Sequence, residues 1–497
     1  MSRRETATAA GAPAARAGSK AAQRPRLVVD CDPGCDDALA LLLAFHAGTY
    51  ERFDIVTVAG NVGIEQVTAN ALRICALAAR YGLLPQGKEL AKKVRIHRGA
   101  AVSLRGERPN AASVHGRDGL GDVPVRVLFD GTDPQATLAR LSGPASNARG
   151  KATGGLVGCS AAQFYAREAS KPTTGPNAEP DLVCTGPLTN LALALGQLPV
   201  GRRHAFWKRW RRVLVMGGAL GVPGNVSYAA EFNTHSDPDA FKLVLESWNE
   251  HVSEAGTDSC TPLVLVPLDV TEQVVLWADE ERLERVRGQF RQATYCLLRK
   301  YFLFHAVSYT PPLGAISKEG EVIPRGVRYP PKNANWLNAE QQIEARKWVQ
   351  RKFTKSRRQA ASGLTVLPRW CFLHDPTAIW LALSWEELRL QDQFRMALAD
   401  GQSAFLRRTF LRVDVGPDDE RGHLLETQPR GWFLSQDEDA RGDLHRVVLA
   451  SSAVPSPASQ ARTRRLREPQ IPPLVRRLRS TRQGLLGQLD ACLALRP

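Results

Sequence analysis

The sequence predicts an α/β protein with a mostly parallel, Rossmann-like sheet, helices on both faces of the sheet, and an active site at the C-terminal strand ends. Short apolar runs rich in β-branched residues are continuous rather than alternating, as in strands that are buried on both faces. Helix-like segments separate several of these runs, and an alternation of strand and helix favours a parallel sheet. Sheets of this kind bind ligands at the carboxyl ends of their strands.

The strands and helices can be expected at defined places along the chain. Six apolar runs are predicted as strands: Leu27–Cys31, Ile55–Ala59, Val94–His97, Asp181–Cys184, Arg212–Met216 and Leu263–Leu268. Helix-like segments follow the first, second and fourth of them: Ala38–Phe45, Val67–Tyr81 and Thr189–Leu198.

The chain divides into one large domain and two tails. We expect an α/β domain over residues 27–450, with insertions at about 122–180 and 305–365. Neither insertion shows sustained periodicity, so both are predicted to be surface excursions. Residues 1–26 form a basic, Ala-rich tail predicted to be disordered, and a transit peptide is the alternative interpretation. Residues 451–497 form a basic, Arg-rich tail that is predicted to be partly helical.

Composition narrows the class of protein. No run of about 18 apolar residues predicts a membrane-spanning helix. The nine cysteines are scattered without metal-binding spacing, which favours a reduced, cytoplasmic protein, with organellar targeting by the basic N-terminus as the alternative. The net charge of +16 is concentrated at the ends and in one internal stretch. Because no nucleic-acid-binding module accompanies it, we expect a solvated basic surface rather than a nucleic-acid site.

Four aspartates lie within eight residues at the end of the first predicted strand. Asp30 and Asp32 precede a turn at Pro33 and Gly34. Asp36 and Asp37 open the apolar helix that follows this turn. Carboxylates this close repel one another, most strongly where the dielectric constant is low. A role as helix caps accounts for only one or two of them. A hard divalent cation such as Ca²⁺, which takes several oxygen ligands, accounts for the whole cluster.

The DxDxxxDD pattern of this cluster resembles the fingerprint of the inosine–uridine-preferring nucleoside hydrolases. Five further segments resemble motifs of that family, in the same order: Gly60–Val62, Val114–Gly121, Thr185–Asn190, Met216–Pro238 and Phe372–Pro376. The two insertions and the basic tails depart from the family pattern. The choice between purine and pyrimidine bases and the assembly of subunits therefore stay open.

The resemblance implies calcium-dependent hydrolysis of the N-glycosidic bond of ribonucleosides, which releases the base and ribose. It implies four metal ligands: Asp32, Asp37, the carbonyl oxygen of Thr185, and Asp375. Asp32 would also accept the proton of the attacking water. His374 is the first candidate for protonating the departing base, since a histidine can donate near neutral pH.

The remaining implied roles concern the substrate. Asp36 and Asn233 are assigned to the 2′ and 3′ hydroxyls of ribose, and Asn225 and Glu231 to the 5′ hydroxyl. Asn61 would support the metal and ribose. Two further residues are His115, near the base and a second candidate acid, and Asp30, which would orient the turn behind the ligands. Relatives of this kind are commonly homodimers or homotetramers.

Two other functions compete with this interpretation. A catalytically lapsed relative could act as a binding or scaffold protein, although all the expected side chains are present. A haloacid-dehalogenase-like phosphatase also places an aspartate pair after a strand. Its loop normally continues with Thr or Val, whereas Asp32 is followed by Pro33 and Gly34.

Overall fold

The computed structural model describes residues 26–123, 156–172, 179–220, 224–227, 229–255, 260–272, 274–277, 370–385, 395–397, 403–413, 415, 421–422, 424–427 and 445–452. The predicted insertion at 305–365 and nearly all of both predicted tails lie outside these ranges, as does most of the predicted insertion at 122–180. No helix within the described ranges is long and apolar enough to cross a membrane.

A parallel sheet forms the centre of the molecule, as the sequence predicts. Six strands pair in parallel in the order β3-β2-β1-β4-β5-β6. They are β1 (Arg26–Cys31), β2 (Arg52–Thr57), β3 (Val94–Arg98), β4 (Asp181–Cys184), β5 (Arg212–Met216) and β6 (Leu263–Val266). The order of the strands reverses between β1 and β4, and such a switch opens a crevice at the carboxyl ends of the two strands.

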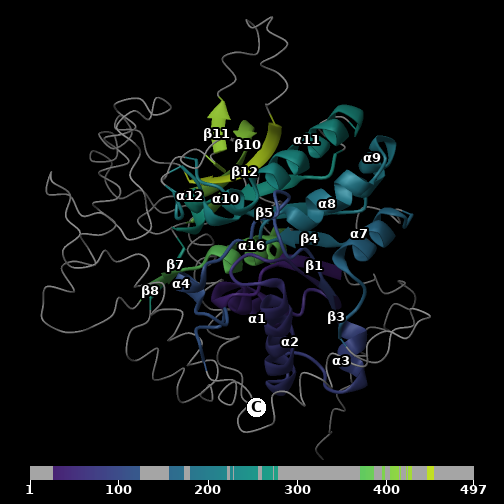
Figure 1. Ribbon diagram of the computed structural model, residues 1–497, viewed down its shortest axis with the longest axis vertical. Coiled ribbons are helices and arrows are strands. Elements are labelled where there is room, and N and C mark those ends of the chain that lie inside the picture. The colour runs from purple at the N-terminus through teal and green to yellow at the C-terminus, as the bar shows by residue number, and fades with distance from the viewer. Residues whose placement is uncertain are drawn as a thin grey trace, which may run out of the picture.

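Helices cover both faces of the sheet, which confirms the predicted fold class (Figure 1). One face carries α1 (Cys35–Ala47), α2 (Ile64–Arg80), α3 (Lys88–Lys93), α12 (Leu268–Thr271) and α16 (His374–Leu383). The other carries α7 (Ala161–Ala169), α8 (Thr189–Gln197), α9 (Val200–Lys208) and α11 (Pro238–Ala255). Successive strand residues supply the two cores in turn. Leu27 and Val29 join the α1 side, and Val28 joins the α8 side.

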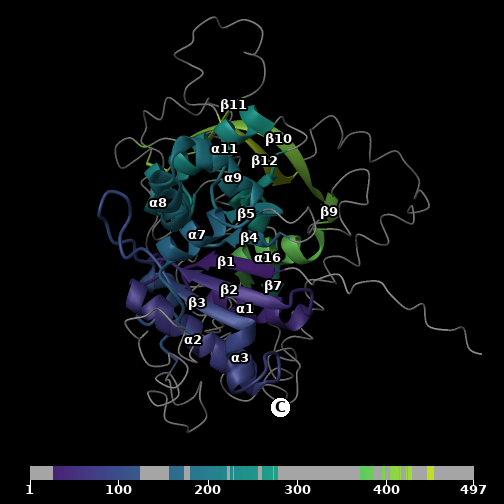
Figure 2. The same ribbon diagram turned by 90° about the vertical axis from the view of Figure 1, so that its right-hand side faces the viewer.

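A further group of strands extends the sheet beyond β6, and the sequence interpretation missed it (Figure 2). β12 (His445–Ser452) pairs in parallel with β6 and antiparallel with β10 (Ser403–Val413). β11 (Leu424–Thr427) and β9 (Arg395–Ala397) pair antiparallel with β10. A separate two-stranded sheet joins β7 (Val275–Trp277) to β8 (Trp370–Phe372).

The predicted surface excursion at about 122–180 is wrong for residues 156–172. Val157 forms a parallel bridge beside Ile96 of β3, and α7 follows it and packs on the sheet. Phe164 and Tyr165 of α7 are buried. A nine-residue helix is too short to show sustained periodicity within a stretch rich in Gly, Ala, Ser and Pro, so the sequence pattern hides it.

Candidate active site

Polar residues that follow three neighbouring strands meet at the carboxyl edge of the sheet. Asp32 follows β1, Asn61 lies beyond β2, and Thr185 follows β4. The backbone N–H of Asn61 donates to Asp32 Oδ2 over 2.7 Å. The Asn61 side-chain amide donates to Asp37 Oδ2 over 3.2 Å, and the Thr185 hydroxyl donates to Asp37 Oδ1 over 2.9 Å. Oxygen-bearing side chains therefore gather at the carboxyl ends of β1 and β4.

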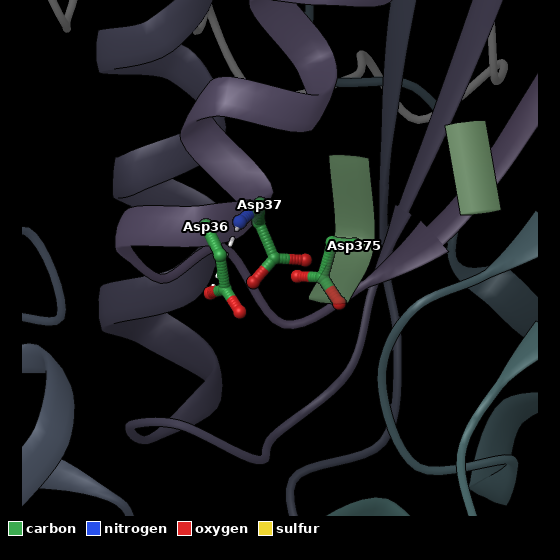
Figure 3. A group of neighbouring side chains, drawn as sticks. All are labelled: Asp36, Asp37 and Asp375. Carbon is green, nitrogen blue, oxygen red and sulfur yellow. Dashed lines mark hydrogen bonds between the residues drawn. The ribbon is translucent and has the colours of Figure 1, made fainter. Parts of the chain in front are cut away.

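A second segment, far along the chain, completes the carboxylate cluster. Helix α1 packs against α16, which brings Asp375 to Asp36 and Asp37. Each of these three buried residues offers a carboxylate oxygen, and the oxygens all lie within 4.8 Å of one another. Figure 3 shows the carboxylates of Asp37 and Asp375 pointing toward one another from α1 and α16. Within the described residues, this group has the geometry to hold a metal ion.

The carboxylates of the cluster carry a large electrostatic cost. Burial, together with the charge of Asp37, holds the pKa of Asp32 well above its usual range. Burial and the charges of Asp36 and Asp37 do the same for Asp375. Burial raises the pKa values of Asp36 and Asp37 to about 6. A bound divalent cation relieves this repulsion, and its preference for hard oxygen ligands matches the four side chains.

Two glycines let the backbone approach Asp32 closely. A Cβ atom at Gly60 would lie 2.0 Å from Asp32 Oδ2, and one at Gly186 would lie 2.8 Å from Asp32 Oδ1. Larger residues at these positions would displace the carboxylate. The sequence interpretation included both glycines in its motifs but did not assign them this role.

The segment between β5 and α11 brings Glu231 to the same edge. Glu231 caps the short helix α10 (Phe232–Ser236) and accepts hydrogen bonds from the backbone N–H groups of Gly218, Asn233 and Thr234. Burial raises its pKa to about 7, with a smaller contribution from the charge of Asp36. Three fixed backbone donors thus hold this carboxylate facing the cluster.

Two asparagines complete that segment. The side-chain amide of Asn233 donates to the carbonyl oxygen of Thr185 over 2.8 Å. The carbonyl oxygen predicted as a metal ligand therefore has an amide donor beside it. Asn225 Oδ1 accepts the backbone N–H of Phe232 over 2.8 Å, so Asn225 is tied to the start of α10.

The two candidate histidines lie in different environments. His374 opens α16, and its Nδ1 lies 2.8 Å from the hydroxyl of Thr271. His115 Nδ1 accepts the backbone N–H of Cys35 over 3.2 Å and lies 3.6 Å from Asp36 Oδ1. Burial lowers the pKa of His115 to about 4, so this ring is neutral at pH 7. The His374 ring, in contrast, is held at Nδ1 by a side-chain hydroxyl. Thr271, which orients it, had no signal in the sequence.

Asp30 is the next-to-last residue of β1 and connects three elements of the fold. Its carboxylate accepts hydrogen bonds from the Tyr165 hydroxyl over 2.6 Å and from the Asn190 amide over 3.0 Å. Its carbonyl oxygen accepts the backbone N–H of Thr185 over 2.8 Å. Burial raises the pKa of Asp30 to about 7. Tyr165 was missed because it lies in the predicted excursion; the only local signal was the pairing of Ser160 with Gln163, which caps α7.

Comparison with known proteins decides the family. Residues 27–450 match the model of the inosine-uridine preferring nucleoside hydrolase family. The chain belongs to this family. The nucleoside hydrolase is 32% identical over 288 residues to a probable uridine nucleosidase from Oryza sativa subsp. japonica, covering 57% of this chain and 71% of that protein. It is also 32% identical over 280 residues to the pyrimidine-specific ribonucleoside hydrolase RihA from Salmonella agona, covering 56% and 72% of the two chains.

The solved structure of a plant nucleoside hydrolase shares the fold, with a TM-score of 0.54 at 19% identity, and the match covers 95% of this chain and 99% of that one. The family resemblance seen in the sequence motifs is confirmed. The protein is an N-glycosyl hydrolase, and its family hydrolyses ribonucleosides and is generally metal-dependent.

Proposed function

We propose that this nucleoside hydrolase hydrolyses ribonucleosides to free base and ribose with calcium held by Asp32, Asp37, Asp375 and the carbonyl oxygen of Thr185. The observation that carries the proposal is the convergence of buried carboxylates from α1 and α16. Burial, together with the charges of the neighbouring aspartates, raises the pKa values of Asp32 and Asp375. A site of this kind gains most from a hard divalent cation with several oxygen ligands. Bound calcium would supply a coordinated water of lowered pKa.

The residues of this chain would manage the protons and the sugar. We assign Asp32 to accept the proton of the attacking water as the water oxygen bonds to C1′ of ribose. The backbone N–H of Asn61 orients the Asp32 carboxylate for that role. Carboxylates around the ribose also favour the positive charge that develops on the sugar in the transition state.

Ribose recognition is assigned to short polar side chains in fixed places. Asp36 and Asn233 would bind the 2′ and 3′ hydroxyls, and Asn225 and Glu231 the 5′ hydroxyl. The backbone donors that hold Glu231 support this, because a carboxylate fixed in advance loses little entropy on binding. Substrates that lack a hydroxyl would leave such groups unpaired and bind poorly.

Departure of the base is assigned to His374. The contact with Thr271 engages Nδ1 of the ring, so we assign proton donation to Nε2. As the C1′–N bond breaks, its electron pair goes to the base nitrogen and the proton of His374 neutralises the base. His115 would lie near the base and hold it through neutral contacts, which its lowered pKa supports.

A substrate panel tests the proposal. Ribose release would be measured with uridine, cytidine, inosine, adenosine and guanosine, with calcium and with a chelator. Uridine comes first because two relatives are named for uridine or pyrimidine nucleosides. We expect release with calcium, loss with the chelator, recovery on adding calcium, and no release by Asp32→Ala. Calcium binding without turnover of any nucleoside would favour the alternative, a lapsed relative acting as a binding or scaffold protein.

Assembly and location are part of the same proposal. We propose a homodimer or homotetramer, which the family resemblance supports, and a cytoplasmic location, which the scattered cysteines support. Light scattering of the purified protein would measure its mass in solution, and a mass equal to a single 54.5 kDa chain would contradict the proposed assembly.

A further inference from the structure

A cysteine, a histidine and an aspartate form a chain of contacts that the proposed reaction does not use. Cys159 lies two residues before the start of α7, His97 belongs to β3 and Asp54 to β2. Cys159 Sγ lies 3.5 Å from His97 Nδ1, and His97 Nε2 lies 2.8 Å from Asp54 Oδ1. His97 and Asp54 are buried, whereas Cys159 is half-buried at the surface. The half-buried Cys159 thus stands at the end of a row whose other two titratable groups, His97 and Asp54, are buried.

The contacts of His97 determine its charge. Nδ1 faces the carbonyl oxygen of Cys159 at 3.2 Å, and a carbonyl oxygen can only accept a hydrogen bond. Nε2 faces the carboxylate of Asp54, which also accepts the guanidinium of Arg26 over 2.9 Å and is therefore ionised. An imidazolium, which carries a proton on each ring nitrogen, satisfies both of these acceptors.

The pKa shifts of His97 and Cys159 agree with a protonated His97 ring. Burial alone lowers the pKa of His97, but the hydrogen bond with Asp54 and the contact with Cys159 outweigh burial and raise it to about 9. Burial alone raises the pKa of Cys159, but the contact with His97 and the charge of Arg167 outweigh burial and lower it.

The surroundings fix the ring in place. His97 stacks on Phe164 of α7 with ring centroids 4.3 Å apart. A Cβ atom at Gly158 would lie 2.8 Å from His97 Cε1, so the backbone before Cys159 closes tightly over the ring. The charged groups around the three residues come from β1, α7 and the turn after α7: Arg26, Arg167, Glu168 and Lys171.

We propose that Cys159 is a thiolate at neutral pH and forms a modification site for peroxides and soft electrophiles, with the His97 imidazolium as its counter-ion. A thiolate beside a cationic histidine in a partly exposed place is the reactive form of cysteine. With hydrogen peroxide, the sulfur forms a bond to one oxygen and the O–O bond breaks. The departing hydroxide takes a proton from His97 to give water. Sulfur is oxidised by two electrons to a sulfenic acid, and the peroxide is reduced.

Alkylation of the full-length, calcium-loaded protein tests the inference. Iodoacetamide would be applied from pH 5 to 9, and mass spectrometry would follow each cysteine separately. We expect the rate at Cys159 to be half-maximal at least about one pH unit below the value of about 8.5 for an ordinary thiol. Cys260, which is also half-buried within the described residues, serves as the internal reference, and the urea-unfolded chain as the external one.

Variants sharpen the test. His97→Gln should slow alkylation of Cys159 at pH 6.5 about 10-fold, because the cation is gone. His46→Gln, which removes a histidine at the end of α1, should leave the rate unchanged. Trapping with dimedone after peroxide treatment should label Cys159 and not a Cys159→Ser protein. A half-maximal rate above about pH 7.5 in the wild-type protein would overturn the inference without any variant.

Discussion

Buried acidic side chains are arranged differently at the two ends of the strands of the central sheet. At the carboxyl ends of the strands, Asp32, Asp37 and Asp375 are surrounded by other carboxylates, which raise their pKa values on top of burial. At the amino ends, buried acids are paired with bases. Asp181, which opens β4, accepts hydrogen bonds from the guanidinium groups of Arg211 and Arg212.

Buried acids on β2 and on α7 are paired with bases in the same way. Burial alone raises the pKa of Asp54, but the hydrogen bond from His97 and the charge of Arg26 lower it overall. Glu168 behaves in the same way beside Arg26 and Lys171. Paired charges support the architecture, whereas an unpaired group of like charges is a cost that the fold tolerates for a ligand. The difference between the two ends separates residues for function from residues for stability.

The largest effect is expected from a substitution at the carboxyl ends of the strands. Asp37→Asn should abolish measurable ribose release because a charged ligand of the cation is lost. The free energy of unfolding of the calcium-free protein should not fall by more than about 1 kcal/mol, since the substitution also removes repulsion from Asp36 and Asp375. Ribose release and urea unfolding in chelator measure the two quantities. Retained turnover would mean that the metal site is wrongly placed.

A second substitution at this end tests chemistry rather than charge. His374→Ala should slow hydrolysis of a natural ribonucleoside by about 10²–10⁴-fold, the usual range for a positioned general acid. It should slow p-nitrophenyl riboside far less, because nitrophenolate departs without a proton. Steady-state rates on both substrates give the comparison. Equal losses would show that His374 serves the metal or the fold.

At the amino end the expected loss is in stability. Asp181→Asn should lower the free energy of unfolding by about 3–5 kcal/mol, because the buried guanidinium group of Arg212 and the partly buried one of Arg211 lose their carboxylate. Turnover per folded molecule should stay close to that of the wild type. Glu89→Gln is the matched control, since its pair with Lys92 is exposed and should contribute less than about 1 kcal/mol. Similar effects of the two variants would contradict the distinction between the ends.

Calcium should raise the free energy of unfolding only through the carboxylates at the carboxyl ends of the strands. At a free concentration of about one hundred times its dissociation constant, a ligand of the folded state raises the free energy of unfolding by about 2.7 kcal/mol. We expect this gain in the wild type and in Asp181→Asn, and little gain in Asp37→Asn. Urea unfolding with and without calcium measures it. Equal stabilisation of Asp37→Asn would place the cation elsewhere.

The smallest effect is a pH dependence at the contact between His97 of β3 and Asp54 of β2. The folded pKa of His97 is raised from 6.5 to about 9, so the folded state binds its proton more tightly than the unfolded state. Its contribution to stability is therefore fully present below about pH 6.5 and is lost as the pH rises through about 9. The stability difference between wild type and His97→Gln should shrink over that window. A difference that is constant from pH 6 to 10 would mean that His97 is not protonated in the fold.

Much of the architecture and most of the site follow from local pattern. The apolar runs that became β1 to β6 are recognisable because strands buried on both faces must be apolar throughout. The acids at Asp30–Asp37 and the motif around Glu231 stand at strand ends, where a parallel sheet gathers its ligands. The boundaries were less certain: α1 begins at Cys35 rather than Ala38, because Asp37 accepts the N–H of Gly34 and extends the first turn.

The sequence alone determined the family, the order of its motifs along the chain and the set of candidate residues. Only the tertiary structure decided which of them meet. It joined Asp36 to Asp37 and Asp375 through the packing of α1 on α16. It also placed Tyr165 of α7 on Asp30, and it added β10 to β12 beyond β6. Local sequence pattern reports whether a segment is buried, but contacts between distant segments depend on how the crossovers pack, and no single segment contains that information.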